Sequence, residues 1–383
     1  MTNLSNNHEF LEGSHAIAKA VALCEPQVVS AYPITPQTHI VEHLAQMKAD
    51  GELTAEYVYA ESEFAAASIV LGASVAGSRA YTATTSQGLL LMTEVLYGIG
   101  GMQLPLVITV ASRAVSGPLN IWNDQQDIVT LRDAGWIQFF AETIQEAVDL
   151  HFIAYKITEK TNIPVMISVD GFLLTHTAEP VILPEKDLVK KYLPPFNPKN
   201  KLDPENPKTF GAFADPSRYQ FVREKFHKDL AESEKVIQTC FKEYADLTGR
   251  GNGNLTEGYE LEDAETVFVS MGSVLGTIKD SVDELRKEGK KVGILKIKSL
   301  RPFPIAEILV QLKNAKKIAV IDKSISLGTA GIFATELRAH CYGKITAPIY
   351  SFVTGLGGKD ITHQSLLEIY KMTEQGIQKT VFI

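Results

Sequence analysis

The sequence predicts an α/β protein, built from a large parallel-sheet domain and a second, smaller α/β domain. Short apolar segments alternate along the chain with longer segments whose apolar residues recur at helical spacing. Several short segments, such as "PLVITVA" (105–111), are apolar at almost every position, which is typical of strands buried on both faces. Alternation of this kind places helices on both faces of a parallel sheet. A chain of 383 residues is long enough for two or three such domains.

The first domain is expected to span residues 1–176. Its clearest helix is 36–48, because Ile40, Leu44 and Met47 recur on one helical face. The segment 62–76 is rich in alanine and is also expected to be helical. The full set of predicted elements is helices at 14–24, 36–48, 62–76, 88–99 and 143–158, and strands at 27–31, 56–60, 79–84, 105–111, 137–141 and 164–169.

Residues 177–261 are expected to form an arm between the two domains. The composition changes from 177 to 215, and the stretch "LPPFNPKNKLDPENPKTFGAFADP" (193–216) is too rich in proline and asparagine for regular structure. A long amphipathic helix should follow at 216–247, ending at the "GRGNGN" linker (249–254), and we expect it to lie at an interface. The second α/β domain should occupy 262–383, with strands at 266–271, 292–297, 317–322 and 347–352 and helices at 274–288, 304–313 and 329–342.

Charge and hydropathy exclude several classes of protein. The formal net charge of −8 argues against a general nucleic-acid binder or a protein that binds anionic membranes. The longest apolar runs are far shorter than the ~20 residues of a membrane-spanning helix. The first residues show no secretory signal pattern, so a cytoplasmic protein is expected.

The cysteines and histidines predict no metal site in this chain. Cys24, Cys240 and Cys341 form no CxxC pair, so neither a zinc site nor a cysteine-ligated cluster is encoded. Scattered cysteines of this kind fit a reduced cytoplasmic compartment. His39 and His43 are four residues apart beside apolar residues, which is more typical of a helix surface than of metal ligands.

Polar side chains follow several of the predicted strands of the first domain. Ligands of open parallel sheets bind beyond the carboxyl ends of the strands, so these side chains could line one rim. They are Thr35, Glu61, Glu63, Ser86, Gln87, Arg113 and Asp170.

Thr35 lies between two prolines in "AYPITPQT" (31–38). It reads most simply as the N-cap of the following helix, with Pro36 at the first helical position. This interpretation does not exclude a binding role, because helix N-termini also attract carboxylates and phosphates.

The other rim residues also have ordinary structural explanations. Arg113 follows an apolar strand and could be a surface or ion-pair residue, or could hold a substrate carboxylate through two hydrogen bonds. Glu63 could simply complement a helix dipole. Glu61 is placed equally well after the same strand, so the pattern alone does not decide which of the two carboxylates is functional. The "MGSVLG" turn (271–276) could cradle a phosphate, although a tight strand-to-helix turn is the simpler explanation.

Four segments in succession resemble the alpha subunit of the 2-oxoacid:ferredoxin oxidoreductases. The closest branch is the pyruvate:ferredoxin oxidoreductases. The likeness continues through "SLRPFP" (299–304), "DKSISLG" (322–328) and "TGLGGKD" (354–360), so it covers essentially the whole chain. The four segments are "AYPITPQT" (31–38), "ESEFAAASIVLGASVAGSRAYTATTSQGLLLMTE" (61–94), "ASRAVSGPLNIWNDQQD" (111–127) and "QEAVDLHFIAYKITEKTNIPVMISVDGF" (145–172).

The resemblance implies one component of a thiamine-diphosphate enzyme that is divided among subunits. The first domain should be of the pyrimidine-binding type, and residues 262–383 should resemble the transketolase C-terminal domain. No GDG motif occurs in this chain, so a beta subunit should carry the half that binds the diphosphate and Mg²⁺. Gamma and ferredoxin-like delta subunits should complete the complex and hold its iron–sulfur clusters. The implied activity converts pyruvate and coenzyme A to acetyl-CoA and CO₂, with electrons passing to ferredoxin.

The resemblance also carries roles onto individual residues. Glu63 matches the glutamate that bonds the aminopyrimidine ring and favours the tautomer able to remove the thiazolium proton. Thr35 and Arg113 match the residues that hold the substrate carboxylate, and Pro33 and Ile34 match cofactor contacts. Many family members carry a histidine in the loop that here reads "NDQQD" (123–127), which leaves the substrate preference open.

Two kinds of alternative remain at this point. The same chemistry could act on another 2-oxoacid, such as 2-oxoisovalerate, an aryl 2-oxoacid or oxalate. Alternatively, the chain could be a noncatalytic scaffold subunit that docks a partner and binds a nucleotide at "MGSVLG" (271–276). Glu63, Arg113 and Thr35 on one rim favour catalysis, because a scaffold does not need that set.

Overall fold

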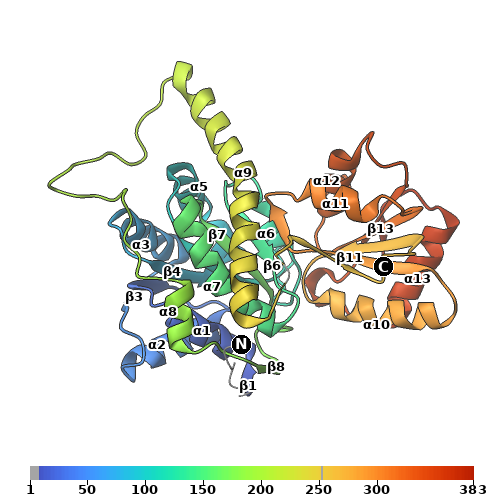
Figure 1. Ribbon diagram of the computed structural model, residues 1–383, viewed down its shortest axis with the longest axis horizontal. Helices are drawn as coiled ribbons and strands as arrows, with labels where there is room; N and C mark the ends of the chain where they lie inside the picture. Colours follow the sequence, from blue (N-terminus) through green and yellow to red (C-terminus); the bar gives the residue numbers. More distant parts are fainter. Residues whose placement is uncertain (1–7, 252) are drawn as a thin grey trace.

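The computed structural model of this chain describes residues 8–251 and 253–383. Two α/β units lie side by side, each around its own sheet, and the long helix α9 (Pro216–Thr248) lies against the first (Figure 1). The predicted α/β class with mainly parallel strands is therefore confirmed. Among the described helices, none combines the length and apolar character needed to cross a bilayer.

Within the described residues, the first sheet has seven strands in the order β12-β6-β7-β5-β4-β2-β3. The six strands predicted for the first domain are all present and run parallel, while β12 pairs antiparallel with β6. The strands are β2 (Val28–Ala31), β3 (Glu56–Tyr59), β4 (Ala80–Thr84), β5 (Val107–Ser112), β6 (Ile137–Phe140), β7 (Val165–Asp170) and β12 (Ser299–Arg301).

Helices cover both faces of this sheet. One apolar cluster joins one face to α1, α2 and α7, and a second cluster joins the other face to α3, α5 and α6. The predicted helix 88–99 is interrupted at Met92, where the Thr93 hydroxyl donates to the carbonyl of Leu90 at 2.6 Å. The helices are α1 (Gly13–Leu23), α2 (Thr38–Ala49), α3 (Glu63–Val75), α4 (Ser86–Leu91), α5 (Thr93–Met102), α6 (Gln126–Thr130) and α7 (Ile144–Thr161).

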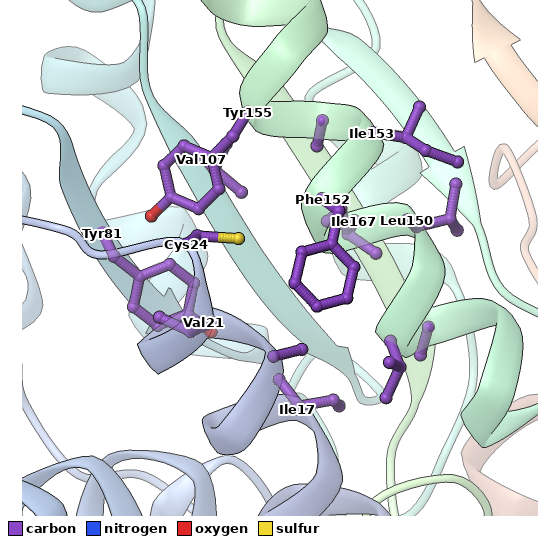
Figure 2. Close-up of a cluster of buried hydrophobic side chains, with 14 of the residues drawn as sticks. Ile17, Val21, Cys24, Tyr81, Val107, Leu150, Phe152, Ile153, Tyr155 and Ile167 are labelled. Carbon is purple, nitrogen blue, oxygen red and sulfur yellow. The ribbon is translucent and has the colours of Figure 1, made fainter. Parts of the chain in front are cut away.

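The first cluster contains the deepest packing of the molecule. Figure 2 shows side chains of α1, the sheet and α7 converging, with Cys24 among Tyr81, Phe152 and Tyr155. Burial raises the pKa of the Cys24 thiol far above its usual range. All three cysteines of the sequence are buried, and none forms a disulfide.

The stretch 193–215 contains no helix or strand, as predicted, but two elements in the preceding part of the arm were missed. Strand β8 (Ala178–Val181) pairs antiparallel with β1 (Glu9–Glu12), and helix α8 (Lys186–Tyr192) packs against α9. Both depend on contacts with distant segments, which local composition does not encode. The end of α9 packs on α7, so its apolar face is covered partly within the chain; the loop before it projects from the body (Figure 1).

The second sheet, counted over the described residues, has six strands in the order β15-β14-β13-β10-β11-β9. Four of them were predicted; β9, β15 and the helix α13 were missed. Helices α10 and α13 cover one face and α11 and α12 the other (Figure 1). The elements are β9 (Thr256–Tyr259), β10 (Thr266–Ser270), α10 (Val274–Lys287), β11 (Val292–Ile297), α11 (Ile305–Leu312), β13 (Lys317–Asp322), α12 (Ile332–Cys341), β14 (Ile349–Val353), a 3₁₀ turn (Leu356–Gly358), α13 (His363–Gln375) and β15 (Val381–Phe382).

The two units share more than a linker. β12 lies beyond the predicted boundary at residue 262 and yet completes the edge of the first sheet. The Lys323 ammonium, at the end of β13, pairs with the Asp170 carboxylate, at the end of β7, at 3.0 Å, and both side chains are almost fully buried. A second buried lysine, Lys296 of β11, pairs with Glu142 and Glu146 of the first unit at 2.7 and 2.9 Å. These charges hold the units in one orientation.

Replacing Lys323 by alanine should lower the free energy of unfolding by about 3–5 kcal/mol, because it leaves the Asp170 carboxylate buried without its cation. Urea unfolding followed by circular dichroism would measure the loss. The control is Lys242→Ala, which breaks the exposed pair with Asp246 and should cost less than about 1 kcal/mol. Equal losses in the two variants would contradict a special role for the buried pair.

Candidate functional site

The carboxyl ends of β2, β3, β4 and β5 bring four loops to one rim of the first sheet. The loop after β3 leads into α3, whose first residue is Glu63. The Ser62 hydroxyl caps this helix by accepting from the amide of Ala65 at 3.2 Å. A carboxylate in the first turn is favoured by the helix dipole, so the local sequence places Glu63 here.

Glu63 is a buried carboxylate with an unfilled hydrogen-bonding capacity. Its side chain is only 7% exposed, and it makes no hydrogen bond or ion pair with any described residue. Glu61, its competitor in the sequence, is exposed. A buried carboxylate without a donor is costly, so Glu63 is a candidate to accept a hydrogen bond from a ligand or a partner chain.

Gly88 packs directly against this carboxylate. A Cβ atom at position 88 would lie 2.7 Å from Glu63 Oε1 and 2.5 Å from Thr84 Oγ1, so any side chain here would collide with both. The Thr84 hydroxyl is itself buried without a hydrogen-bond partner among the described residues. Glycine at position 88 therefore allows Glu63 and Thr84 to lie close to the start of α4.

Arg113 follows β5 and is only 6% exposed. Its guanidinium donates to the carbonyl oxygens of Thr35 at 2.8 Å and Asn120 at 3.1 Å, and to Gln87 Oε1 at 3.3 Å. It forms no ion pair within 8–251 or 253–383, and burial lowers its pKa from the usual value. A buried cation without an anionic partner favours a negatively charged ligand at this point.

Thr35 lies beside Arg113, but the prediction that it caps a helix was wrong. α2 begins at Thr38, and residues 34–37 form a turn in which the Gln37 amide donates to the Ile34 carbonyl at 2.8 Å. The Gln37 side chain is buried and donates to the Ala83 carbonyl at 2.8 Å, which holds the turn against β4. Thr35 is exposed and contacts Arg113 through its carbonyl rather than its hydroxyl.

The two other residues of the turn that the resemblance assigned to the cofactor lie on the same rim. Pro33 is exposed and Ile34 is partly buried. Their side chains are thus available to a ligand or to another chain.

Gln87 is a site residue that the sequence indicated only by its place after a strand. A guanidinium can only donate, so the amide atom that faces Arg113 is the oxygen. This orientation leaves Gln87 Nε2 buried without a partner among the described residues. The donor Gln87 Nε2 and the acceptor Glu63 therefore both lie next to Gly88, and neither has a hydrogen-bond partner among the described residues.

Asp127 was missed, and it fixes the geometry of two rim loops. Its carboxylate accepts from the backbone amides of Ser86 at 2.9 Å, Arg113 at 3.0 Å and Ile128 at 2.7 Å. Burial is the largest influence on this carboxyl and raises its pKa to about 7, while the amide donors oppose the shift. Its only signal in the sequence is the end of "NDQQD", which no spacing rule relates to Ser86.

Several residues that the sequence offered as candidates instead join the two units. Gln125 Nε2 donates to the Met271 carbonyl at 3.2 Å, and Gln126 Oε1 accepts from the Ile325 amide at 2.9 Å, so both side chains bond the second unit. The amide of Ser273 in "MGSVLG" donates to Asp170 Oδ2 at 3.0 Å. This bond occupies the turn that was a candidate phosphate cradle, and the strand-to-helix turn is the correct interpretation.

Two protein-family models match this chain. The family model described as "Pyruvate flavodoxin/ferredoxin oxidoreductase, thiamine diP-bdg" matches residues 19–242, and "Pyruvate:ferredoxin oxidoreductase core domain II" matches 264–366. The first match alone covers more than half of the chain. The chain belongs to the pyruvate:ferredoxin oxidoreductase family. Its first domain is accordingly of the thiamine-diphosphate-binding type.

Relatives within the pyruvate:ferredoxin oxidoreductase family match along nearly the whole chain. Pyruvate synthase subunit PorA of Methanosarcina barkeri is 49% identical over 95% of this chain and 92% of its own. PorA of Methanothermobacter thermautotrophicus is 44% identical over 97% of both chains. Ketoisovalerate oxidoreductase subunit VorA of Pyrococcus horikoshii is 44% identical over 92% of this chain and 90% of its own.

Two solved structures show the same fold. A 2-oxoglutarate:ferredoxin oxidoreductase from Magnetococcus marinus aligns with a TM-score of 0.73 and 21% identity over 96% of this chain. This chain spans 65% of that longer one. A split-gene transketolase aligns with a TM-score of 0.56 and 10% identity over 97% of this chain and 100% of its own.

Asp127 should make stability depend on pH. Its folded pKa of about 7 exceeds the ordinary 3.8, so between these values the folded chain holds a proton that the unfolded chain has released. The free energy of unfolding of the wild type, relative to Asp127→Ala, should therefore fall as pH rises from about 4 to 7. Urea-unfolding midpoints at half-unit pH steps would measure this, and a difference that grew with pH would contradict it.

Proposed function

We propose that this chain is the alpha component of a multi-subunit pyruvate:ferredoxin oxidoreductase. In this function it converts pyruvate and coenzyme A to acetyl-CoA and CO₂, with the electrons passing to ferredoxin. The observation that carries the proposal is the pair of buried, unneutralised charges, Glu63 and Arg113, on one rim of a thiamine-diphosphate-binding-type domain. The pyruvate synthase names of relatives up to 49% identical support pyruvate as the substrate.

Glu63 is assigned to the aminopyrimidine ring of thiamine diphosphate. The Glu63 carboxyl group makes no hydrogen bond or ion pair with any described residue, so it is free to bond a ring nitrogen. A carboxyl group there can share a proton with a ring nitrogen and so select the tautomer of the ring. When bound, thiamine diphosphate supplies the electron sink for decarboxylation of a 2-oxoacid. Pro33 and Ile34 are assigned to the same ligand, because their loop ends at this rim.

Arg113 is assigned to the substrate carboxylate. Three of the five guanidinium N–H groups serve protein oxygens, which leaves donors for a carboxylate and holds the group rigidly. Gln87 Nε2 offers a further donor for a substrate oxygen. Thr35 lies beside Arg113 and has a short, uncharged side chain. Such a side chain leaves room for the methyl group of pyruvate, but it cannot pair with the second carboxylate of a dicarboxylate substrate.

The site needs a second chain to be complete. The chain lacks a GDG motif for the diphosphate and Mg²⁺, which we assign to a beta subunit, and lacks a CxxC pair for iron–sulfur clusters, which we assign to a delta subunit. Large apolar side chains are exposed on the elements around Glu63, namely Tyr59, Phe64, Leu91 and Tyr97. A partner that covered them would also close the rim from water. We further propose gamma, ferredoxin and coenzyme A as partners in a cytoplasmic complex.

A branched-chain 2-oxoacid is the second candidate substrate. The observation in its favour is the VorA relative, at 44% identity, which is as similar as the second PorA. Assaying the native complex with pyruvate and 2-oxoisovalerate, coenzyme A and a low-potential acceptor would decide between them. A higher kcat/KM for 2-oxoisovalerate would overturn the assignment of pyruvate.

Glu63→Gln in the assembled complex should nearly abolish 2-oxoacid oxidation, because an amide cannot share the ring proton as a carboxyl group does. Steady-state oxidation would be measured together with subunit composition, which should not change. Glu61→Gln, two residues away and exposed, is the matched control and should keep its activity. Full activity in Glu63→Gln would remove the basis of the proposal.

Arg113→Ala should weaken substrate binding by about 2–5 kcal/mol, the range for losing a buried charged hydrogen bond. KM and the dissociation constant for pyruvate would both be measured, with exposed Arg218→Ala as the control. If neither constant changed, another group would hold the carboxylate.

A further inference from the structure

Three side chains that can bind metal lie together on the first unit although they are far apart in sequence. Glu12 ends β1, His39 lies in the first turn of α2, and His176 lies between β7 and β8. One ligand atom of each lies within 4.8 Å of the others. We propose that Glu12, His39 and His176 bind a divalent transition-metal ion, for which zinc suits this donor set best.

The backbone holds two of the three ligands close together. Next to Glu12, Ser14 donates to the Thr175 carbonyl from its amide at 3.0 Å and from its hydroxyl at 2.8 Å. The antiparallel pairing of β1 with β8 continues from this point, with Glu12 opposite Ala178. Main-chain hydrogen bonds therefore hold the segment of Glu12 next to the segment of His176.

His39 completes the group from a third element. Its Nδ1 lies 2.7 Å from Glu12 Oε1, and its ring centroid lies 4.5 Å from that of His176. Zinc takes imidazole nitrogen and carboxylate oxygen at about 2.0–2.2 Å, so small movements of partly exposed side chains would bring all three into its shell. The side chains of His39 and Glu12 are 42% and 32% exposed, so an ion can reach them and water can fill the fourth position.

His176 is oriented in the manner of a ligand. Its Nδ1 lies 2.7 Å from the Thr175 hydroxyl, whose oxygen also accepts from the Phe172 amide at 2.8 Å. Metal-binding histidines are commonly held through their second nitrogen in this way.

An ordinary ion pair explains only part of this arrangement. A Glu12–His39 pair accounts for two residues but not for the second imidazole packed on the first. His43, on the same helix, stacks on His15 at 4.4 Å and lies outside the group of three. It provides a matched control, because it is a histidine of α2 with a comparable environment.

The test uses the whole native complex, so that the partner subunits are in place. The complex would be dialysed against a chelator and then against zinc chloride, and zinc would be counted by mass spectrometry for the wild type, His39→Gln, His176→Gln and His43→Gln. The wild type and His43→Gln should bind one zinc ion more per alpha chain than the other two variants. Zinc X-ray absorption of the wild type should show nitrogen and oxygen neighbours at about 2.0–2.1 Å from that ion.

Thermal unfolding gives a second readout that does not rely on activity. Zinc should raise the unfolding midpoint of the wild type and of His43→Gln, because it binds the folded chain. Glu12→Gln, which keeps the shape of the side chain, should weaken zinc binding at least tenfold. Equal zinc content in the wild type, His39→Gln and His176→Gln, or a zinc shell composed of sulfur, would overturn the proposal.

Discussion

The buried carboxylate of Asp170 is the point on which the arrangement of this chain depends. It lies at the end of a central strand of the first sheet and accepts from Lys323 and Ser273, which follow two strands of the second sheet. A charge this deeply buried must keep its partners, because the interior does not solvate it. The two sheets are therefore held with their carboxyl ends facing one another, and Gln125 adds a further bond, to the Met271 carbonyl of the second unit.

The first sheet, held in this way, carries a rim whose polar groups are only partly satisfied. Asp127 ties the loops after β4 and β5 together through backbone amides, and Arg113 ties them to the loop after β2. Thr84 and Gln87 nevertheless keep buried atoms without partners among the described residues. The buried residue Glu63 makes no hydrogen bond or ion pair with a described residue. Such groups are typical of functional sites, where local rules of folding are broken.

The rim is separate from a large cleft between the two units. That cleft, of about 1000 Å³, lies between the two units beside Trp122, Phe172 and Lys359 and is not lined by Glu63 or Arg113. A catalytic site assembled at a subunit interface is open on each chain by itself, so cavity size is a poor guide to it. Unpartnered buried charge is the better guide here, because its cost persists until a ligand or a partner chain arrives.

Much of the site followed from the sequence, with errors that share one cause. The position of Glu63 followed from a helix start after a strand, and that of Arg113 from the end of an apolar strand; the structure places both at one rim. Thr35 was correctly predicted to lie near Arg113, but it does not cap a helix. The Gln37 side chain donates to the Ala83 carbonyl in the interior, and α2 begins only after Gln37. Asp127, and the meeting of Glu12 with His39 and His176, have no signature in local spacing.

The sequence by itself determined the alternation of strands and helices, the parallel sheets and the family, because hydrophobic periodicity and ordered motifs are local properties of the chain. Only the tertiary structure decided that β12 joins the first sheet and that β8 forms against β1. Only it decided which polar groups lack partners. Strand pairing at edges and the hydrogen bonding of buried groups depend on residues far apart in the chain, and their energies exist only once those residues have been brought together.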